Sequence, residues 1–366
     1  MFTALSGLSF HLMCIFSRES GAAPELPGQN VATGASMSEY PANAPCEDRH
    51  IVTSGDNIVF AAVMDGHGGW QAAEFAVRST SSHCRLSIDC CELCPQKNNL
   101  WRNIQGELAG RPLNLDCGTL KSSAIVESLV RGYERTDRDF MTAIRPAFDV
   151  GFGDVSRVGC CAVCEIVTKK EIIVANAGDC RAVVGCQGAV GTPADTPHPL
   201  SASGAVASSK ASPAGWTAVC LSEDHNCRHE NIKEELRAAH PGEDDIVVCR
   251  SSTSCYVKGR LQPTRALGDL YLKYSEFNGK PGTRLYGRHI KPPYTPPYVT
   301  ATPQVQVHAI DGTRDAFVLL ACDGVWVRPT RELVMSFITS QFTGRIVERG
   351  GRGVHRQRLG ESDDCQ

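Results

Sequence analysis

Two short apolar segments of this chain each end at an aspartate that is followed by glycine. VFAAVMD ends at Asp65, before Gly66, and VLLACD ends at Asp323, before Gly324. A short apolar run closed by a glycine-rich turn is typical of a buried β-strand. A carboxylate at the end of a buried strand costs free energy unless a cation or hydrogen-bond donors meet it. We therefore expect a fold that brings the acidic ends of several buried strands together.

Further acids follow the same arrangement. Asp179 follows the strand-like segment EIIVANAG, Glu47 and Asp48 are adjacent in PCEDRH, and His67 follows the first Asp-Gly pair. Each Asp-Gly pair alone is most often a turn, and a single His in a glycine-rich turn is usually just exposed. In combination, carboxylate oxygens suit Mg²⁺ or Mn²⁺, and His67 can titrate near neutral pH. The combination predicts a divalent-cation site.

Periodicity predicts the remaining elements. Between 120 and 144, apolar residues recur at steps of three, four or seven, which predicts an amphipathic helix that Pro146 ends. Thr168, Lys169 and Lys170 separate two strand-like segments in the manner of a hairpin. Shorter helices are predicted over 70–78, 229–240 and 330–342, and strands over 57–65, 161–167, 171–177, 181–185, 216–222 and 317–323.

Composition excludes several classes of protein. The formal net charge is −3 over 366 residues, so a nucleic-acid partner is not expected. No apolar stretch reaches the roughly 18 residues of a membrane span, so none is predicted. Many of the 18 cysteines lie inside apolar strand segments, as Cys161 and Cys164 do. We interpret them as reduced structural thiols, with zinc binding as the alternative.

Six stretches of the chain match a known family in its order. CEDRH (46–50), VFAAVMDGHGG (59–69), VANAGDCRAVVG (174–185), LSEDHN (221–226), PTRALGD (263–269) and LLACDGVW (319–326) resemble the metal-dependent serine/threonine protein phosphatases of type 2C. The resemblance covers about residues 40 to 340. It implies an α+β fold, a four-layer α-β-β-α sandwich with two central antiparallel sheets and a metal site between them at one end.

Three stretches are most similar to one branch of that family, the pyruvate dehydrogenase phosphatases. They are ANAPCEDR (42–49), LSEDHN with the following EELRAAHP (234–241), and HIKPPYTPPYVTATPQVQVH (289–308). This narrower resemblance predicts a phosphoprotein substrate such as pyruvate dehydrogenase.

The family resemblance also implies a metal centre. Two Mg²⁺ or Mn²⁺ ions would be bridged by Asp65, with the Gly66 carbonyl on one ion and Asp323 on the other. Glu47 and Asp48 would hold metal-bound waters. Two metals lower the pKa of a bridging water, so hydroxide would attack phosphorus in line.

Other residues receive roles by the same resemblance. His67 would protonate the leaving Ser or Thr oxygen as general acid, Asp179 would bind a third metal ion, and Asn43 would bind phosphate. Two departures weaken the match. Val327 stands where the family has an acid, which puts the third metal in doubt, and the family's final Asp motif is missing, with Asp363 as its one substitute.

The chain is expected to contain one phosphatase-like domain over 41–342, with a flexible leader at 1–40, a disordered insertion at 187–215 and a patternless Arg- and Gly-rich tail at 343–366. The predicted function is metal-dependent hydrolysis of phosphoserine and phosphothreonine. The alternatives are a catalytically impaired phosphatase-like binding protein and a truncated or misread copy of a longer enzyme.

Location and oligomeric state are less constrained. The predicted location is intracellular, mitochondrial by resemblance and otherwise cytoplasmic, and the oligomeric state is left open. Cys180 and Cys322 flank two of the site acids, so oxidation sensitivity is a further hypothesis.

Overall fold

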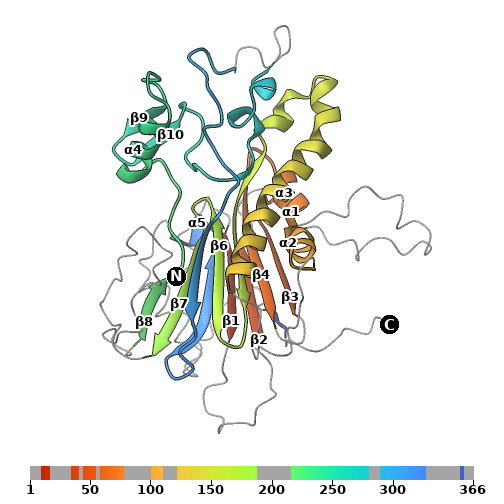
Figure 1. Cartoon of the computed structure of the whole chain (residues 1–366), viewed down its shortest axis with the longest axis vertical. Helices are drawn as coiled ribbons and strands as arrows, with labels where there is room; N and C mark the ends of the chain where they lie inside the picture. The colour runs from red at the N-terminus through yellow and green to blue at the C-terminus, as the bar shows by residue number, and fades with distance from the viewer. Residues whose placement is uncertain are drawn as a thin grey trace, which may run out of the picture.

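Two antiparallel sheets form the centre of the molecule (Figure 1). The structure, a computed structural model, describes residues 10–16, 34–40, 44–54, 58–77, 100–109, 122–187, 216–279, 289–326 and 355–357. The first sheet has the order β12 (Gln304–Ala309), β6 (Glu171–Ala177), β5 (Gly159–Val167), β4 (Val59–His67) and β3 (Arg49–Ser54), with β11 (Leu267–Gly268) beside β5. The second has the order β14 (His355–Gln357), β2 (Gly34–Tyr40), β1 (Phe10–Phe16), β13 (Asp315–Ala321), β7 (Arg181–Gln187) and β8 (Trp216–Cys220).

The alternation of side chains along β5 divides the core into two layers. Val163 belongs to an apolar cluster that also contains Val184 and Leu319 of the second sheet, so this cluster fills the space between the sheets. Ile166 lies instead with Phe60 in a cluster on the outer face of the first sheet. Every residue of β5 is buried, and a strand buried on both faces is expected to be a continuous apolar run.

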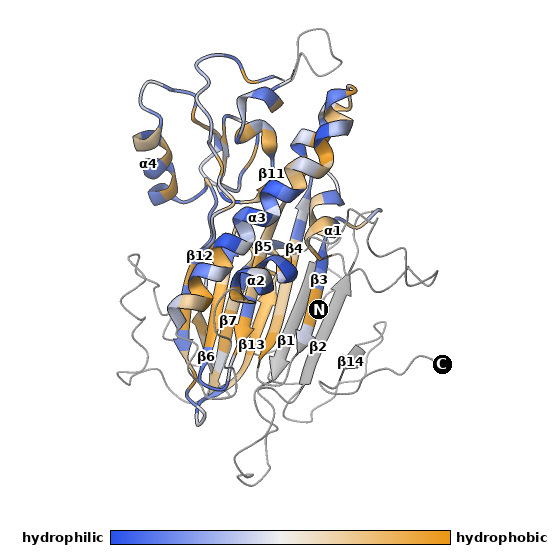
Figure 2. Ribbon diagram, turned by 45° about the vertical axis from the view of Figure 1, so that its right-hand side comes forward, coloured by the Kyte–Doolittle hydropathy of each residue, from blue (hydrophilic) through white to orange (hydrophobic). Residues whose placement is uncertain are grey.

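Three helices cover that outer face: α1 (Gln71–Val77), α2 (Leu100–Ala109) and α3 (Ser122–Asp149). Figure 2 shows α2 and α3 lying over the apolar strands. The Tyr133 hydroxyl of α3 lies 3.2 Å from the Ala162 carbonyl oxygen and 3.0 Å from that of Ala175, which fixes α3 on β5 and β6. A Cβ at Gly132 would lie 2.4 Å from Ile104 Cγ1, so the glycine allows α2 and α3 to pack closely. The predicted α+β class with two central antiparallel sheets is confirmed.

Helix α3 continues through Pro146, so the predicted helix end is wrong. The Phe148 ring packs 4.7 Å from that of Phe277, and the Arg145 guanidinium lies 4.7 Å from the same Phe277 ring. Tertiary packing therefore stabilises the last turn, although proline weakens a helix interior. The short 3₁₀ helix η4 (Gly153–Arg157) then leads into β5.

Strands β4, β5, β6, β7, β8 and β13 and helix α1 confirm predicted elements, with ends shifted by a few residues. The helix predicted at 330–342 lies outside the described residues, as do residues 188–215 of the predicted insertion. Strands β1 and β2 fall inside the range predicted as a flexible leader, and β14 falls inside the predicted tail. Pairing with β13 places β1, and pairing with β1 and β14 places β2, so long-range partners rather than local pattern define these strands.

The described residues of 222–266, 269–279 and 289–299 lie outside the two sheets and are here named the α4 lobe. It contains α4 (Glu230–Ala239), which confirms a predicted helix, the hairpin of β9 (Val247–Ser251) and β10 (Ser254–Val257), and the 3₁₀ helices η6 (Leu270–Leu272) and η7 (Ser275–Phe277). Figure 1 shows α4, β9 and β10 set apart from the sheets. The lobe has its own apolar cluster, which includes Leu236, Tyr271 and Tyr298.

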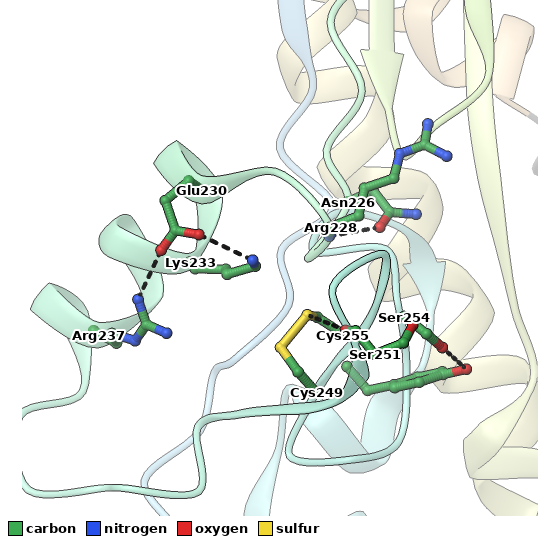
Figure 3. The surroundings of a disulfide bond; sticks show 10 residues. Asn226, Arg228, Glu230, Lys233, Arg237, Cys249, Ser251, Ser254 and Cys255 are labelled. Atoms are coloured by element: carbon green, nitrogen blue, oxygen red, sulfur yellow. Dashed lines mark hydrogen bonds and ion pairs between the residues drawn. A yellow bond between two sulfur atoms is a disulfide. The ribbon is translucent and has the colours of Figure 1, made fainter.

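A disulfide joins Cys249 of β9 to Cys255 of β10, directly across the hairpin (Figure 3). This corrects the prediction that the cysteines are all reduced, because a hairpin was not predicted here and the pairing depends on its register. Nine further cysteines whose side chains are described, seven of them buried, form no disulfide. Within the described residues, no helix is long and apolar enough to cross a membrane.

Candidate active site

Strand direction brings the predicted acids to one edge of the sandwich. Asp65 lies near the end of β4 and Asp179 two residues after β6, and both strands run antiparallel to β5 between them. Asp48 directly precedes β3, whose first residue pairs beside the end of β4. Asp323 follows β13, whose last residue pairs with the first residue of β7, two positions after Asp179. We name Asp48, Asp65, Asp179 and Asp323 the acid cluster.

The Asp65 and Asp323 carboxyl groups interact with each other inside the acid cluster, and each influences the pKa of the other. Burial and the nearby carboxylates of Asp48, Asp323 and Asp179 raise the pKa of Asp65 well above its usual range. Burial and the Asp179 carboxylate likewise raise the pKa of Asp323. These shifts have the direction expected for like charges held close together.

Neighbouring side chains fix the orientation of the other two acids. Asp179 is 6% exposed, and its Oδ2 accepts a hydrogen bond of 2.7 Å from Asn226 Nδ2. Its Oδ1 accepts one of 3.2 Å from the Cys161 thiol. The Cys322 thiol lies 3.5 Å from Asp48 Oδ2. Two of the buried thiols therefore contact the acid cluster directly.

The donor set of this edge fits Mg²⁺ or Mn²⁺. All its carboxylates supply hard oxygen ligands. A Cβ at Gly66 would lie 2.3 Å from the Glu47 carbonyl oxygen, so only glycine allows the two backbones to approach this closely. Within the described part of the chain, no three His, Cys, Asp or Glu side chains already have the spacing of a metal site.

His67, at the end of β4, pairs with an acid that the sequence analysis quoted without a role. Its Nε2 lies 2.7 Å from Asp269 Oδ2, and the two side chains are 24% and 1% exposed. Burial lowers the pKa of His67, but the Asp269 carboxylate more than offsets this, so the pKa is raised overall. The ring is therefore protonated over a wider pH range than a free imidazole.

Arg49 holds the turn that carries Glu47 and Asp48. Its Nη1 donates hydrogen bonds to the carbonyl oxygens of Cys46 at 2.8 Å and of Asp48 at 2.7 Å, and its Nε donates to Glu74 Oε2 of α1 at 2.7 Å. Arg49 thus links the turn to helix α1.

Arg181 and Arg228 supply positive charge beside the acid cluster. Arg181 binds Asp224 through two hydrogen bonds of 2.7 Å, and Arg228 donates to the same carboxylate. Burial tends to raise the pKa of Asp224, but the hydrogen bond from Arg181 and the surrounding charges hold it far below its usual range. Asp224 is therefore an anion that positions both arginines.

The structure brings together most of the predicted site residues and leaves three outside. Glu47, Asp48, Asp65, Asp179 and Asp323 lie at one edge, with Gly66 and His67 beside them. Asn43, Val327 and Asp363 lie outside the described residues. Sequence reasoning gave no role to Asn226, Asp269 or Arg49. Each lies in a quoted family stretch, which was the one signal that could have identified it.

Fold and site together define an α+β sandwich with an acidic, histidine-containing edge. The sequence profile described as "Protein phosphatase 2C" matches residues 39–348. The chain therefore belongs to the protein phosphatase 2C family.

The chain is also similar to individual proteins. "Probable protein phosphatase 2C 42" of Arabidopsis thaliana is 28% identical over 303 residues, which cover 83% of this chain and 64% of the relative. "Probable protein phosphatase 2C 43" of Oryza sativa subsp. japonica is 26% identical over 304 residues, covering 83% and 63%. The chain thus spans less than two thirds of the length of these relatives. A solved structure of serine-threonine phosphatase 2C from Toxoplasma gondii is 14% identical, with a TM-score of 0.48 over 82% of this chain and 80% of that one.

Proposed function

We propose that this chain is a metal-dependent protein phosphatase that hydrolyses phosphoserine and phosphothreonine in proteins. The observation that carries the proposal is the convergence of the acid cluster at one edge of the sandwich, beside the pair of His67 and Asp269. Carboxylates held together in this way are expected to bind a divalent cation, because the cation offsets their mutual repulsion.

In this proposal the chain holds two cations. Asp65, Asp323 and the Gly66 carbonyl would hold them, and Glu47 and Asp48 would orient bound water. Asp179 provides the position for a third, weaker ion. When bound, Mg²⁺ or Mn²⁺ supplies an activated water and neutralises charge on the phosphoryl group.

The protein's own groups complete the reaction. Arg49 holds the turn of Glu47 and Asp48, and Arg181 and Arg228 reduce the repulsion between the acid cluster and an anionic substrate. His67 gives a proton to the departing Ser or Thr oxygen, which leaves as the alcohol.

Hydrolysis of a phosphothreonine peptide with Mn²⁺ tests the proposal. Asp65→Asn is expected to lower kcat by about 100-fold or more, because the acid cluster loses one of the carboxylates that would hold the cations. Asp244→Asn changes an exposed acid of the α4 lobe and serves as the control, with unchanged activity expected. Equal activity of wild type and Asp65→Asn would overturn the proposal. Peptide binding without turnover would favour the alternative, a catalytically impaired phosphatase-like binding protein.

The narrower prediction concerns the substrate. Pyruvate dehydrogenase stays a predicted substrate, and a mitochondrial location a predicted location. Both are supported by the three stretches that resemble the pyruvate dehydrogenase phosphatases. The names of the two plant relatives identify no substrate.

A further inference from the structure

We propose that Asp269 is a positioning residue that holds the His67 ring by Nε2 and leaves Nδ1 to deliver the proton to the leaving group. This inference rests on the proposed phosphatase function. Three features carry it: the contact across Gly159, the conformation of Asp269, and the burial of its carboxylate.

The pair lies across a position that has no side chain. His67 of β4 pairs with Gly159 of β5, and Gly159 pairs with Gly268 of β11, directly before Asp269. A Cβ at Gly159 would lie 2.2 Å from Asp269 Oδ2 and 2.6 Å from His67 Nε2. The imidazole and the carboxylate therefore occupy the space that any other residue at 159 would fill.

The backbone of Asp269 has an uncommon conformation that its neighbours hold in place. Its φ is 50° and its ψ is 42°, the left-handed region, and Gly268 before it has a φ of +80°. Asp269 N–H donates to the Val158 carbonyl oxygen at 2.9 Å. Left-handed backbone at a non-glycine residue costs about 1 kcal/mol and persists where the surroundings determine it.

Helix α3 supplies the support behind this turn. Asp137 Oδ1 accepts a hydrogen bond of 2.7 Å from Gly268 N–H and another of 2.7 Å from Lys273 Nζ. Lys273 also donates to the Ala266 carbonyl oxygen at 2.8 Å. The buried lysine is therefore paired with Asp137, and the Asp269 carboxylate is left to His67.

Burial makes the carboxylate dependent on the imidazole. Asp269 is 0% exposed, and its Oδ1 has no hydrogen-bond partner in the structure. A buried carboxylate needs a cation or a donor to offset its desolvation. His67 provides both through Nε2–H, since an ionised carboxylate can only accept a hydrogen bond.

The contact determines which ring nitrogen reacts. Because Nε2–H is bound to Asp269, Nδ1 is the nitrogen free to face a leaving group. As the P–O bond to the Ser or Thr oxygen breaks, the Nδ1 proton moves to that oxygen, which gives an alcohol and a neutral imidazole. Asp269 acts on the substrate only through His67.

The leaving group distinguishes this role from a structural one. A phosphothreonine peptide releases a basic alkoxide and needs the proton, whereas p-nitrophenyl phosphate releases a stable phenolate and does not. Asp269→Asn is expected to lower kcat for the peptide by about 100-fold, and for p-nitrophenyl phosphate by about threefold or less. Asparagine has the same size and tolerates left-handed backbone.

Two further variants sharpen the test. His67→Gln is expected to show the same substrate dependence, and the double variant Asp269→Asn with His67→Gln is expected to lose no more than His67→Gln alone. Gly159→Ala separates the pair without changing either member, because the atoms that must move are the ends of two side chains. It should reproduce the pattern even if Asp269→Asn does not fold. Equal losses on both substrates, or additive losses in the double variant, would overturn the proposal.

A spectroscopic measurement keeps this test separate from the proposed function. In ¹H–¹⁵N correlation spectra at pH 8, the His67 ring should carry its proton on Nε2 in the wild type and lose that preference in Asp269→Asn. The spectrum of His67→Gln identifies the signal. Unchanged tautomers in Asp269→Asn would overturn the positioning role. An inactive wild type with the expected tautomer would instead overturn the phosphatase proposal alone.

Discussion

The α4 lobe and the sandwich bury charged side chains in opposite ways. In the lobe, the Lys258 side chain is 0% exposed, and its Nζ lies 2.5 Å from both Glu243 Oε2 and Asp245 Oδ1. In the sandwich, Glu165 of β5 is 0% exposed, and neither of its carboxyl oxygens has a hydrogen-bond partner in the structure. Glu165 lies two residues from both Val163 and Val167, so it shares their face of β5 and points between the sheets.

The difference shows that burial alone does not determine what a charge contributes to stability. Removing Lys258 would leave the buried Glu243 carboxylate without its ion partner. Removing Glu165 would instead remove the cost of burying a carboxyl group whose oxygens accept no hydrogen bond. The two regions should therefore respond to charge removal with opposite signs. Each of the following experiments changes one side of this comparison.

The largest effect is expected for Lys258→Met. Glu243 would stay buried without its ion partner, so the free energy of unfolding should fall by about 3–5 kcal/mol. Urea unfolding measures the loss, and hydrogen exchange should place it in β9 and β10. Lys169→Met, at an exposed lysine, is the matched control. Adding Glu243→Gln to Lys258→Met should recover part of the loss, and a loss below about 1 kcal/mol would show that the ion pair contributes little.

A smaller effect of opposite sign is expected for Glu165→Met. Burial raises the pKa of Glu165 from 4.5 to about 8. Replacing this group by an apolar side chain should stabilise the fold by about 1–3 kcal/mol near pH 6. Chemical unfolding measures the change, and reduced stability of Glu165→Met would contradict it.

The pH dependence of Glu165 has a definite sign. Between pH 4.5 and about 8 the folded protein keeps a proton that the unfolded chain releases, so its stability falls as pH rises. The slope from this group approaches about 1.4 kcal/mol per pH unit and levels off above its folded pKa. Glu165→Gln keeps the size but does not titrate, so its stability should lack this slope. An unchanged slope would show that Glu165 does not cause it.

The smallest effect is expected for Cys249→Ser. The disulfide closes a loop with a sequence separation of 6, so its loss should cost about 2 kcal/mol or less. The effect should be confined to the α4 lobe, with p-nitrophenyl phosphate hydrolysis unchanged. A reductant should lower wild-type stability by the same amount and leave Cys249→Ser unaffected. Reductant sensitivity of Cys249→Ser would instead point to another pair of cysteines.

Local sequence pattern predicted the acid cluster but not the residues around it. Asp65 and Asp323 could be predicted because each ends an apolar run, and strand ends meet at a sheet edge. Asp269 could not, because its role depends on a left-handed turn and on a contact with a residue 202 positions away. The helix end predicted at Pro146 is wrong for the same reason, because the packing of Phe148 on Phe277 outweighs the local effect of the proline.

The separation of the site residues along the chain has a consequence for folding kinetics. Asp48 contacts Cys322 across 274 residues, and His67 contacts Asp269 across 202. Contacts this distant close long loops, so they form slowly and late compared with hairpins and helices. On refolding, α3 and the β5–β6 hairpin should regain their structure first. Recovery of the acidic edge should lag behind them, so a catalytic assay would follow a slower event than circular dichroism does.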